Sequence, residues 1–164
     1  MDKKDVIRPT DDGARQEAQS LLAGASHAAL AVIEPASGTP MATRIALALD
    51  TDGAPMTLVS DLSPHTGAMR TEPRASLLVG EPGPKGDPLA YPRLTVSVSA
   101  RFIAPDDPER PAIRSHWLSL RPKTKLYIDF ADFHLVQFEI QSAALNGGFG
   151  KAFLLTAADL LVTN

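Results

Sequence analysis

The sequence predicts a mainly β (α+β) fold in which six antiparallel strands form a small barrel with peripheral helices. Six runs of residues have the length and the apolar content of strands. Most connections between them are short turns, which leave no room for the helical crossovers that parallel strands need. With 164 residues, of which 44% are hydrophobic and 21% charged, the chain fits one domain over residues 1–164 with a single sizeable core.

The first third of the chain predicts one helix and a three-stranded meander. Thr10 or Asp11 is expected to cap the helix, whose apolar residues recur at helical spacing, and Gly24 lies near its end. Turn residues separate the strands that follow. These strands are expected over residues 27–33, 41–49 and 56–60.

A short helix is predicted over residues 64–71, with Ser63 as its N-cap and proline at its first position. The fourth strand covers residues 75–79. The segment 81–88, rich in proline and glycine, is expected to be irregular and exposed. The fifth strand, residues 93–103, alternates cleanly between apolar and polar side chains, which is typical of a half-buried strand.

The last third predicts a helix, a strand and a weaker segment. The helix covers about residues 108–120 and is expected to be capped by Asp106 or Asp107. The sixth strand covers residues 135–140. The chain ends in a weakly amphipathic tail around residues 157–161.

Composition and charge exclude several classes of function. The net charge of -3 argues against nucleic-acid binding through broad phosphate attraction. The absence of cysteine rules out disulfides and a cysteine nucleophile, and the four histidines lack metal-ligand spacing, so we predict no metal site. No segment resembles a signal peptide or reaches membrane-spanning length, so we expect a cytoplasmic location. No P-loop, GxGxxG or GxSxG motif is present.

One stretch combines hydroxyls, a histidine and a helix N-terminus at the end of a strand. Ser60, Ser63, His65 and Thr66 offer hydrogen-bond donors there, and a helix N-terminus favours an anion. Arg44, on a neighbouring strand among small apolar residues, is a candidate cation whose planar fork suits a phosphate. The alternative is an ordinary capped turn with a surface histidine and a solvated arginine. The local pattern alone favours that alternative.

The glycine-rich stretch 146–151 is a second candidate. Its glycines allow the backbone to approach a ligand closely, and Lys151 places a cation at the exit of the turn. The alternative is a tight connection before the terminal segment, and the turn considered alone favours it.

In chain order, several segments resemble the pyridoxamine-phosphate-oxidase-like flavin-binding split barrels, and most closely their HugZ-like haem-utilisation branch. The ordered set covers nearly the whole chain and reverses the preference for an ordinary turn. The matching segments are residues 42–47 with Arg44, 58–66, 72–79, 126–133 and 147–152.

The resemblance implies a six-stranded antiparallel split β-barrel that forms a homodimer with FMN at the subunit interface. Thr95 matches a polar position that approaches the flavin, and Lys151 could reach the cofactor from the partner subunit. His65 stands where the classical oxidases have a lysine, so its charge would vary with pH near neutrality. The residues implied around the phosphate and ribityl chain are Arg44, Ser60, Ser63, His65 and Thr66.

The chain lacks the segment that binds pyridoxal phosphate in the classical oxidases and their C-terminal Arg-x-His-Asp-Arg motif, so we do not expect oxidation of pyridoxamine phosphate. The leading hypothesis is a cytoplasmic, dimeric FMN-binding oxidoreductase acting on an unidentified small molecule, with catalytic residues unknown. The first alternative is a haem-binding protein of iron utilisation. The second is a non-catalytic dimeric barrel with a decayed cofactor site. None of the three involves nucleic acid or a membrane.

Overall fold

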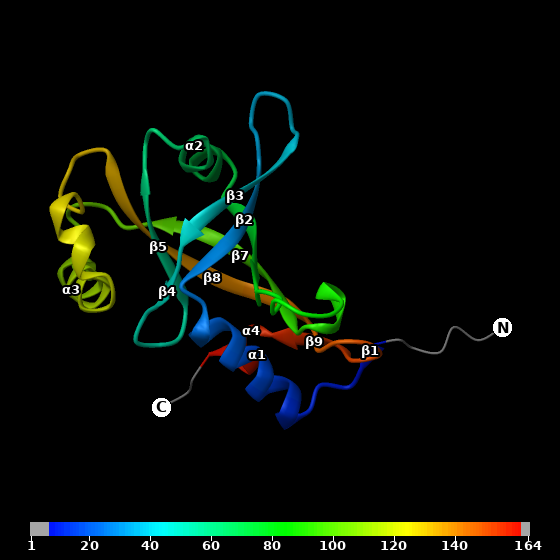
Figure 1. The fold of residues 1–164 in the computed structure, drawn as a ribbon. Helices are drawn as coiled ribbons and strands as arrows, with labels where there is room; N and C mark the ends of the chain where they lie inside the picture. Colours follow the sequence, from blue (N-terminus) through cyan, green and yellow to red (C-terminus); the bar gives the residue numbers. More distant parts are fainter. Residues whose placement is uncertain (1–6, 162–164) are drawn as a thin grey trace.

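The computed structural model describes residues 7–161, so the N-terminal residues examined for a signal segment lie outside this range. Six strand segments close into an antiparallel ring in the order β2–β3/β4–β5–β8–β7–β6 and back to β2 (Figure 1). The strands are β2 (His27–Ile33), β3 (Pro40–Ala46), β4 (Ala48–Leu49), β5 (Pro55–Ser60), β6 (Arg74–Val79), β7 (Arg93–Phe102) and β8 (Phe133–Asn146).

The ring confirms the predicted six-stranded antiparallel barrel, although residues 7–161 contain nine strands rather than six. The expected strand 41–49 is interrupted at Leu47, whose side chain is buried in the core, and so divides into β3 and β4. Two short strands lie beyond the ring. β9 (Ala152–Thr156) pairs antiparallel with β8, and β1 (Ile7–Arg8) pairs parallel with β9.

Strand β8 is more than twice as long as the predicted strand 135–140 because a β-bulge lies at its middle. Ser142 pairs with Ser97 and Ile140 with Val98, so Gln141 has no partner on β7. Even-numbered residues up to Ile140 face the core, whereas after the bulge Ala143 and Leu145 do so. The extra residue therefore keeps apolar side chains pointing inward along the whole strand.

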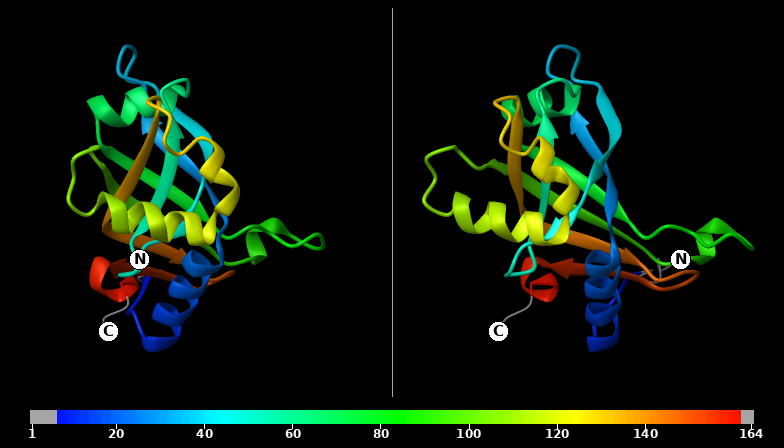
Figure 2. Two further views of the ribbon diagram at one scale, coloured as in Figure 1. Left: turned by 90° about the vertical axis from the view of Figure 1, so that its left-hand side faces the viewer. Right: turned by 60° about the vertical axis from the view of Figure 1, so that its left-hand side comes forward.

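In the described part of the chain four α-helices surround the barrel, with α2 at one end and α1 towards the other (Figures 1 and 2). Two short 3₁₀ segments, η1 (Pro88–Ala90) and η2 (Pro122–Leu126), lie in the connections. No helix within residues 7–161 is long and apolar enough to span a bilayer. The helices are α1 (Asp12–Gly24), α2 (Pro64–Thr71), α3 (Arg110–Leu120) and α4 (Ala157–Leu160).

The predicted helix caps are only partly formed. Asp11 caps α1 as expected, since its Oδ1 accepts the N–H of Ala14 at 2.8 Å. Ser63 occupies the N-cap position of α2, but its hydroxyl makes no capping hydrogen bond. Helix α3 begins after the predicted position, with Glu109 at its N-cap, because Asp107 instead accepts the N–H of Glu109 in the turn before the helix.

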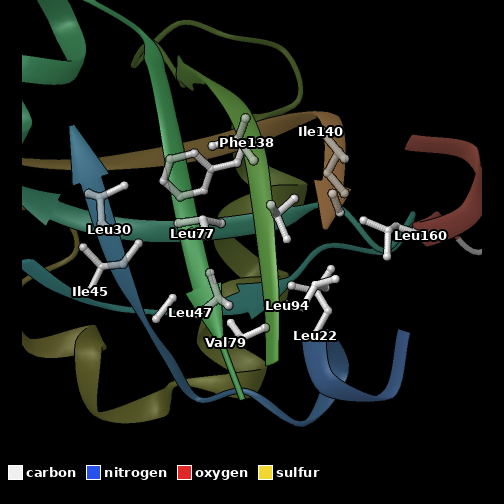
Figure 3. Close-up of a cluster of buried hydrophobic side chains, with 14 of the residues drawn as sticks. Leu22, Leu30, Ile45, Leu47, Leu77, Val79, Leu94, Phe138, Ile140 and Leu160 are labelled. Atoms are coloured by element: carbon white, nitrogen blue, oxygen red, sulfur yellow. The ribbon is translucent and has the colours of Figure 1, made fainter. Parts of the chain in front are cut away.

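Two apolar clusters hold the fold together. The larger fills the barrel and extends to α1 and α4; Figure 3 shows Leu30, Leu77 and Phe138 within it. The smaller lies outside the ring, where Trp117 of α3 packs with residues of β4, β5 and β8. Helix α3 therefore covers the outside of β4, β5 and β8 (Figure 2).

Candidate functional site

The candidate phosphate site lies at the seam where the barrel ring is weakest. Only two residue pairs join β4 to β5, and the hydroxyl of Thr57 donates to the carbonyl of Ala46 at 2.6 Å just beyond them. The ladder then stops, so no residue of β3 pairs with β5. Arg44 and Ser60 thus lie on the two strands that border this seam.

The turn between β5 and α2 is held by its own hydroxyls. Ser60 Oγ donates to Oδ2 of Asp132 at 3.2 Å and accepts the N–H of Leu62 at 3.1 Å. Thr66 is fully buried, and its hydroxyl donates to the carbonyl of Ser60 at 2.6 Å. The structure therefore gives Thr66 a supporting position in the turn, where its hydroxyl is already engaged.

Ser63 and His65 retain free hydrogen-bonding capacity at the start of α2. Within residues 7–161 neither side chain makes a hydrogen bond to another group. Ser63 is half-buried, and only 8% of the His65 surface is exposed. Burial lowers the pKa of His65 from its ordinary value of 6.5, so the imidazole is neutral at pH 7 and offers one N–H donor.

Arg44 is the free cation of the site. Its side chain is exposed on the outward face of β3, and it forms no ion pair or side-chain hydrogen bond in the described part of the chain. Its cross-strand neighbour is Ala29, which leaves the space around the guanidinium open. An arginine fork in this setting is available to an anion.

Thr95 lies on the same outward face, on β7. The cross-strand pairs run from Arg44 through Ala29 and Leu78 to Thr95. Three strand spacings separate Arg44 from Thr95, or about 14 Å. The structure therefore places Thr95 on the same surface as Arg44, but not in direct reach of it.

The outward face between these two residues is lined by small side chains. The next row of cross-strand pairs consists of Ala42, Ala31, Ser76 and Ser97. A cavity of about 420 Å³ opens beside them, with Gln141 at its edge. Strand alternation predicts which residues point outward, but the sequence does not reveal that no helix covers them, so it missed this surface.

Lys151 lies elsewhere. It closes the turn between β8 and β9, where its carbonyl accepts the N–H of Gly147 at 2.7 Å and the positive φ of +105° requires glycine at position 148. Thirteen residue steps of β8 (133 to 146) separate the partner of Ser60 from the turn. This corresponds to about 43 Å of strand. A role for Lys151 at the cofactor stays a prediction that requires a second chain.

The site contains few groups suited to acid–base chemistry. Within residues 7–161, His65 is neutral, Arg44 is a cation, and the nearby carboxylates Asp61 and Asp132 are engaged by His134 and Ser60. Among residues 7–161, no three histidines or carboxylates gather as a metal site would require. The geometry is therefore suited to holding an anionic ligand.

Comparisons with known proteins relate the chain to haem proteins. No protein-family model matches it. It is 29% identical over 117 residues to the chloroplastic heme oxygenase HOZ of Arabidopsis thaliana, covering 71% of this chain but only 35% of that protein. A solved heme-binding protein from Mycobacterium smegmatis is 30% identical, with a TM-score of 0.79 over 94% of this chain and 61% of that one. Another solved chain is 42% identical, with a TM-score of 0.83 over 95% of this chain and 100% of that chain.

A more distant likeness concerns the fold alone. A pyridoxamine 5'-phosphate oxidase-type protein from Listeria innocua is 14% identical, with a TM-score of 0.62 over 82% of this chain and 98% of that one. The ring of six strands, the split at the β3–β5 seam and these similarities agree on the fold. The chain has the fold of the pyridoxamine 5'-phosphate oxidase-like split barrels and resembles their HugZ-like haem-utilisation branch.

Proposed function

We propose that the chain binds FMN as one subunit of a cytoplasmic homodimer and acts as an oxidoreductase on a small molecule. The observation that carries this proposal is the unpaired guanidinium of Arg44, on the strand that borders the seam opposite β5. The free hydroxyl of Ser63 and the imidazole of His65 lie at the adjoining helix start.

These groups match the chemistry of a phosphate monoester. Such a group carries about 1.5 to 2 negative charges and several acceptor oxygens near neutral pH. Arg44 supplies a bidentate cation, Ser63 and His65 supply neutral donors, and the N-terminus of α2 adds a favourable dipole. Thr66 contributes by holding the turn that carries them.

The outward sheet face is suited to a planar ring system. Small side chains such as Ala31 and Ser76 leave room for a flat ligand against the strands, and Thr95 offers a hydroxyl to a polar ring edge. FMN supplies the redox chemistry when bound, while the chain binds it and fixes its orientation.

A second copy of the chain would complete this site. The same face exposes apolar side chains, among them Ile33 at 39% and Leu78 at 44%. Apolar residues exposed together on a sheet face favour association with a partner. In such a dimer Lys151 would approach the cofactor of the other subunit, which one chain alone does not allow.

Haem is the second candidate ligand, and the similarity to a heme-binding protein and to a heme oxygenase favours it. A porphyrin is also planar and anionic, and its propionates would take the place of the phosphate at Arg44. This chain spans only 61% of the heme-binding protein and 35% of the heme oxygenase, so we propose their ligand for it rather than infer it from the similarity alone.

Titration of the purified protein with FMN, riboflavin and haemin separates these candidates. We expect FMN to bind, and Arg44→Gln to weaken FMN about 10- to 100-fold while leaving riboflavin, which lacks the phosphate, unchanged. Arg101→Gln, an exposed arginine already paired with Asp107 and Glu109, is the control. Equal losses for FMN and riboflavin would refute the phosphate site.

The remaining outcomes are also distinct. A Soret shift on adding haemin, without any FMN binding, would support the haem candidate instead. Failure of both ligands to bind would refute both candidates and leave the non-catalytic barrel.

A further inference from the structure

We propose a second ligand site, separate from the seam, that binds small planar aromatic carboxylates. A cavity of about 490 Å³ lies where α2 meets the loop after β7 and the loop before β8. This volume is typical of sites for small molecules. The walls that matter for recognition are formed by Arg70, Phe102, Arg110, Phe130, Phe133 and His134.

Aromatic rings form two walls of this cavity. The rings of Phe102 and His134 meet edge to face at 6.2 Å between centroids, and those of Phe130 and Phe133 at 6.4 Å. Phe130 is 58% exposed, and Phe133 beside it is half-buried. Rings that project in this way can pack against a further aromatic ring.

Two arginines point to a negative charge on the ligand. The guanidinium of Arg70 lies 4.2 Å from the ring centroid of Phe102 and makes no hydrogen bond to any described residue. Its nearest carboxylate, on Asp61, is 4.0 Å away. Arg110 donates one N–H to the carbonyl of Ile103 at 3.1 Å, and its other side-chain N–H groups make no hydrogen bond within residues 7–161. Both forks are therefore available to a carboxylate.

The two carboxylates nearest the cavity are each engaged by another side chain. Asp61 lies 2.8 Å from Nε2 of His134. Asp129 accepts two hydrogen bonds from Arg114, at 2.8 and 2.5 Å, and this arginine lowers the pKa of Asp129. Donor groups of Arg70 and Arg110 therefore remain available to an anion at the cavity wall.

The cavity and the seam lie on opposite sides of β5, although both adjoin the turn after it, where Phe133 pairs with Ser60 and His134 lies 2.8 Å from Asp61. Strand β5 pairs with β4 at the seam on one side and with β8 on the other. Arg44 belongs to the β3 side, whereas His134 and Phe133 belong to β8. In Figure 1 the connection from β7 to α3 lies to the left of α2, away from β3. A ligand in one site does not need the other to be filled.

Fluorescence titration with anthranilate, a small aromatic carboxylate, tests the proposal, with the uncharged anthranilamide as the matched probe. We expect anthranilate to bind at least tenfold more tightly than anthranilamide. Arg70→Gln should remove that preference, and Phe130→Ala should weaken both probes. Both substitutions change side chains that are at least 46% exposed, and circular dichroism verifies that the variants fold.

Two control variants separate this site from the rest of the molecule. Arg44→Gln, at the seam, and Phe149→Ala, 75% exposed on the β8–β9 turn, should leave anthranilate binding unchanged. The proposal is overturned if anthranilate does not bind, if the two probes bind equally, or if Arg44→Gln weakens anthranilate as much as Arg70→Gln does. FMN binding in the Arg70→Gln variant reports on the seam separately, so the two proposals can fail independently.

Discussion

Removal of the Thr124 hydroxyl tests how α3 is attached to the barrel. Trp117 is fully buried in the outer cluster, and its indole N–H donates to Oγ1 of Thr124 at 3.0 Å. The same hydroxyl donates to the carbonyl of Arg121 at 2.7 Å. The substitution Thr124→Val keeps the shape of the side chain and removes both bonds.

The expected cost follows from these contacts. A buried N–H without an acceptor costs about 1–3 kcal/mol, so with the second bond also lost Thr124→Val should lower the free energy of unfolding by about 2 kcal/mol. Trp117→Phe leaves a void and should cost about 2 kcal/mol. Phenylalanine has no N–H to leave unpaired. The double variant should therefore be more stable than additivity predicts by about 1 kcal/mol.

Urea denaturation of the four proteins at one protein concentration measures this coupling. The transition must be followed by far-UV circular dichroism, because Trp117 is the only tryptophan of the chain. A loss of 2 kcal/mol shifts the midpoint by about 1 M urea at the slopes typical of small proteins. If the effects of the two single substitutions add within about 0.3 kcal/mol in the double variant, the hydrogen bond between Trp117 and Thr124 does not stabilise the packing of α3.

Three further predictions concern glycine, helix capping and pH. Gly80→Ala should destabilise the chain by about 2 kcal/mol or more, because φ is +101° and the new Cβ would lie 2.6 Å from a carbonyl oxygen. Gly67→Ala, which has open space in α2, should instead stabilise the chain by about 0.5–1 kcal/mol. Thermal melts distinguish the two variants, and equal effects would contradict the backbone geometry. Asp11→Ala should cost about 1 kcal/mol and Ser63→Ala less than about 0.5 kcal/mol, since only the first side chain caps its helix; a larger loss at position 63 in urea denaturation would show a missing bond. Burial lowers the pKa of His65, so as the pH falls the unfolded chain binds a proton at this histidine before the folded chain does, and the free energy of unfolding decreases below pH 6.5. His65→Gln should reduce this loss of stability between pH 7.5 and 5. If stability depends on pH equally in the variant, the titration of His65 is not its cause.

The parts of the fold that depend on local pattern were predictable from the sequence. The capping carboxylate of Asp11 and the apolar spacing after it define α1 almost to the residue. The alternation of β7 gives its bounds within one residue. In both cases neighbouring residues carry the whole signal, because a cap and a period act over a few positions.

The errors arose where tertiary structure interrupts a local pattern. The alternation that marks β8 breaks at Gln141, and a strand predicted by alternation ends there, whereas in the structure a bulge restores the inward face. The segment 152–156 forms β9 because it pairs with the second half of that strand. A strand predicted to end at residue 140 leaves no partner for the segment 152–156.

The candidate site shows the same division. Hydroxyls at a helix start are visible in the sequence, but the seam that Arg44 borders is formed by a ladder between β4 and β5. Burial then separates residues of the same type, since Thr66 supports the turn while Ser63 remains free. The aromatic cavity could not be predicted, because α2, β7 and β8 bring its walls together from distant parts of the chain.

The ladder between β4 and β5 has two residue pairs, the fewest of any joint in the ring, whereas β7 and β8 share ten. Opening it breaks few hydrogen bonds, so the backbone amides there should exchange with deuterated solvent well before those of the long β7–β8 ladder. A ligand that contacts Arg44 on one side and Ser63 on the other would span this joint. Such a ligand would hold the two strands together. It should slow amide hydrogen exchange along β4 and β5 and leave the exchange rates of the rest of the barrel unchanged.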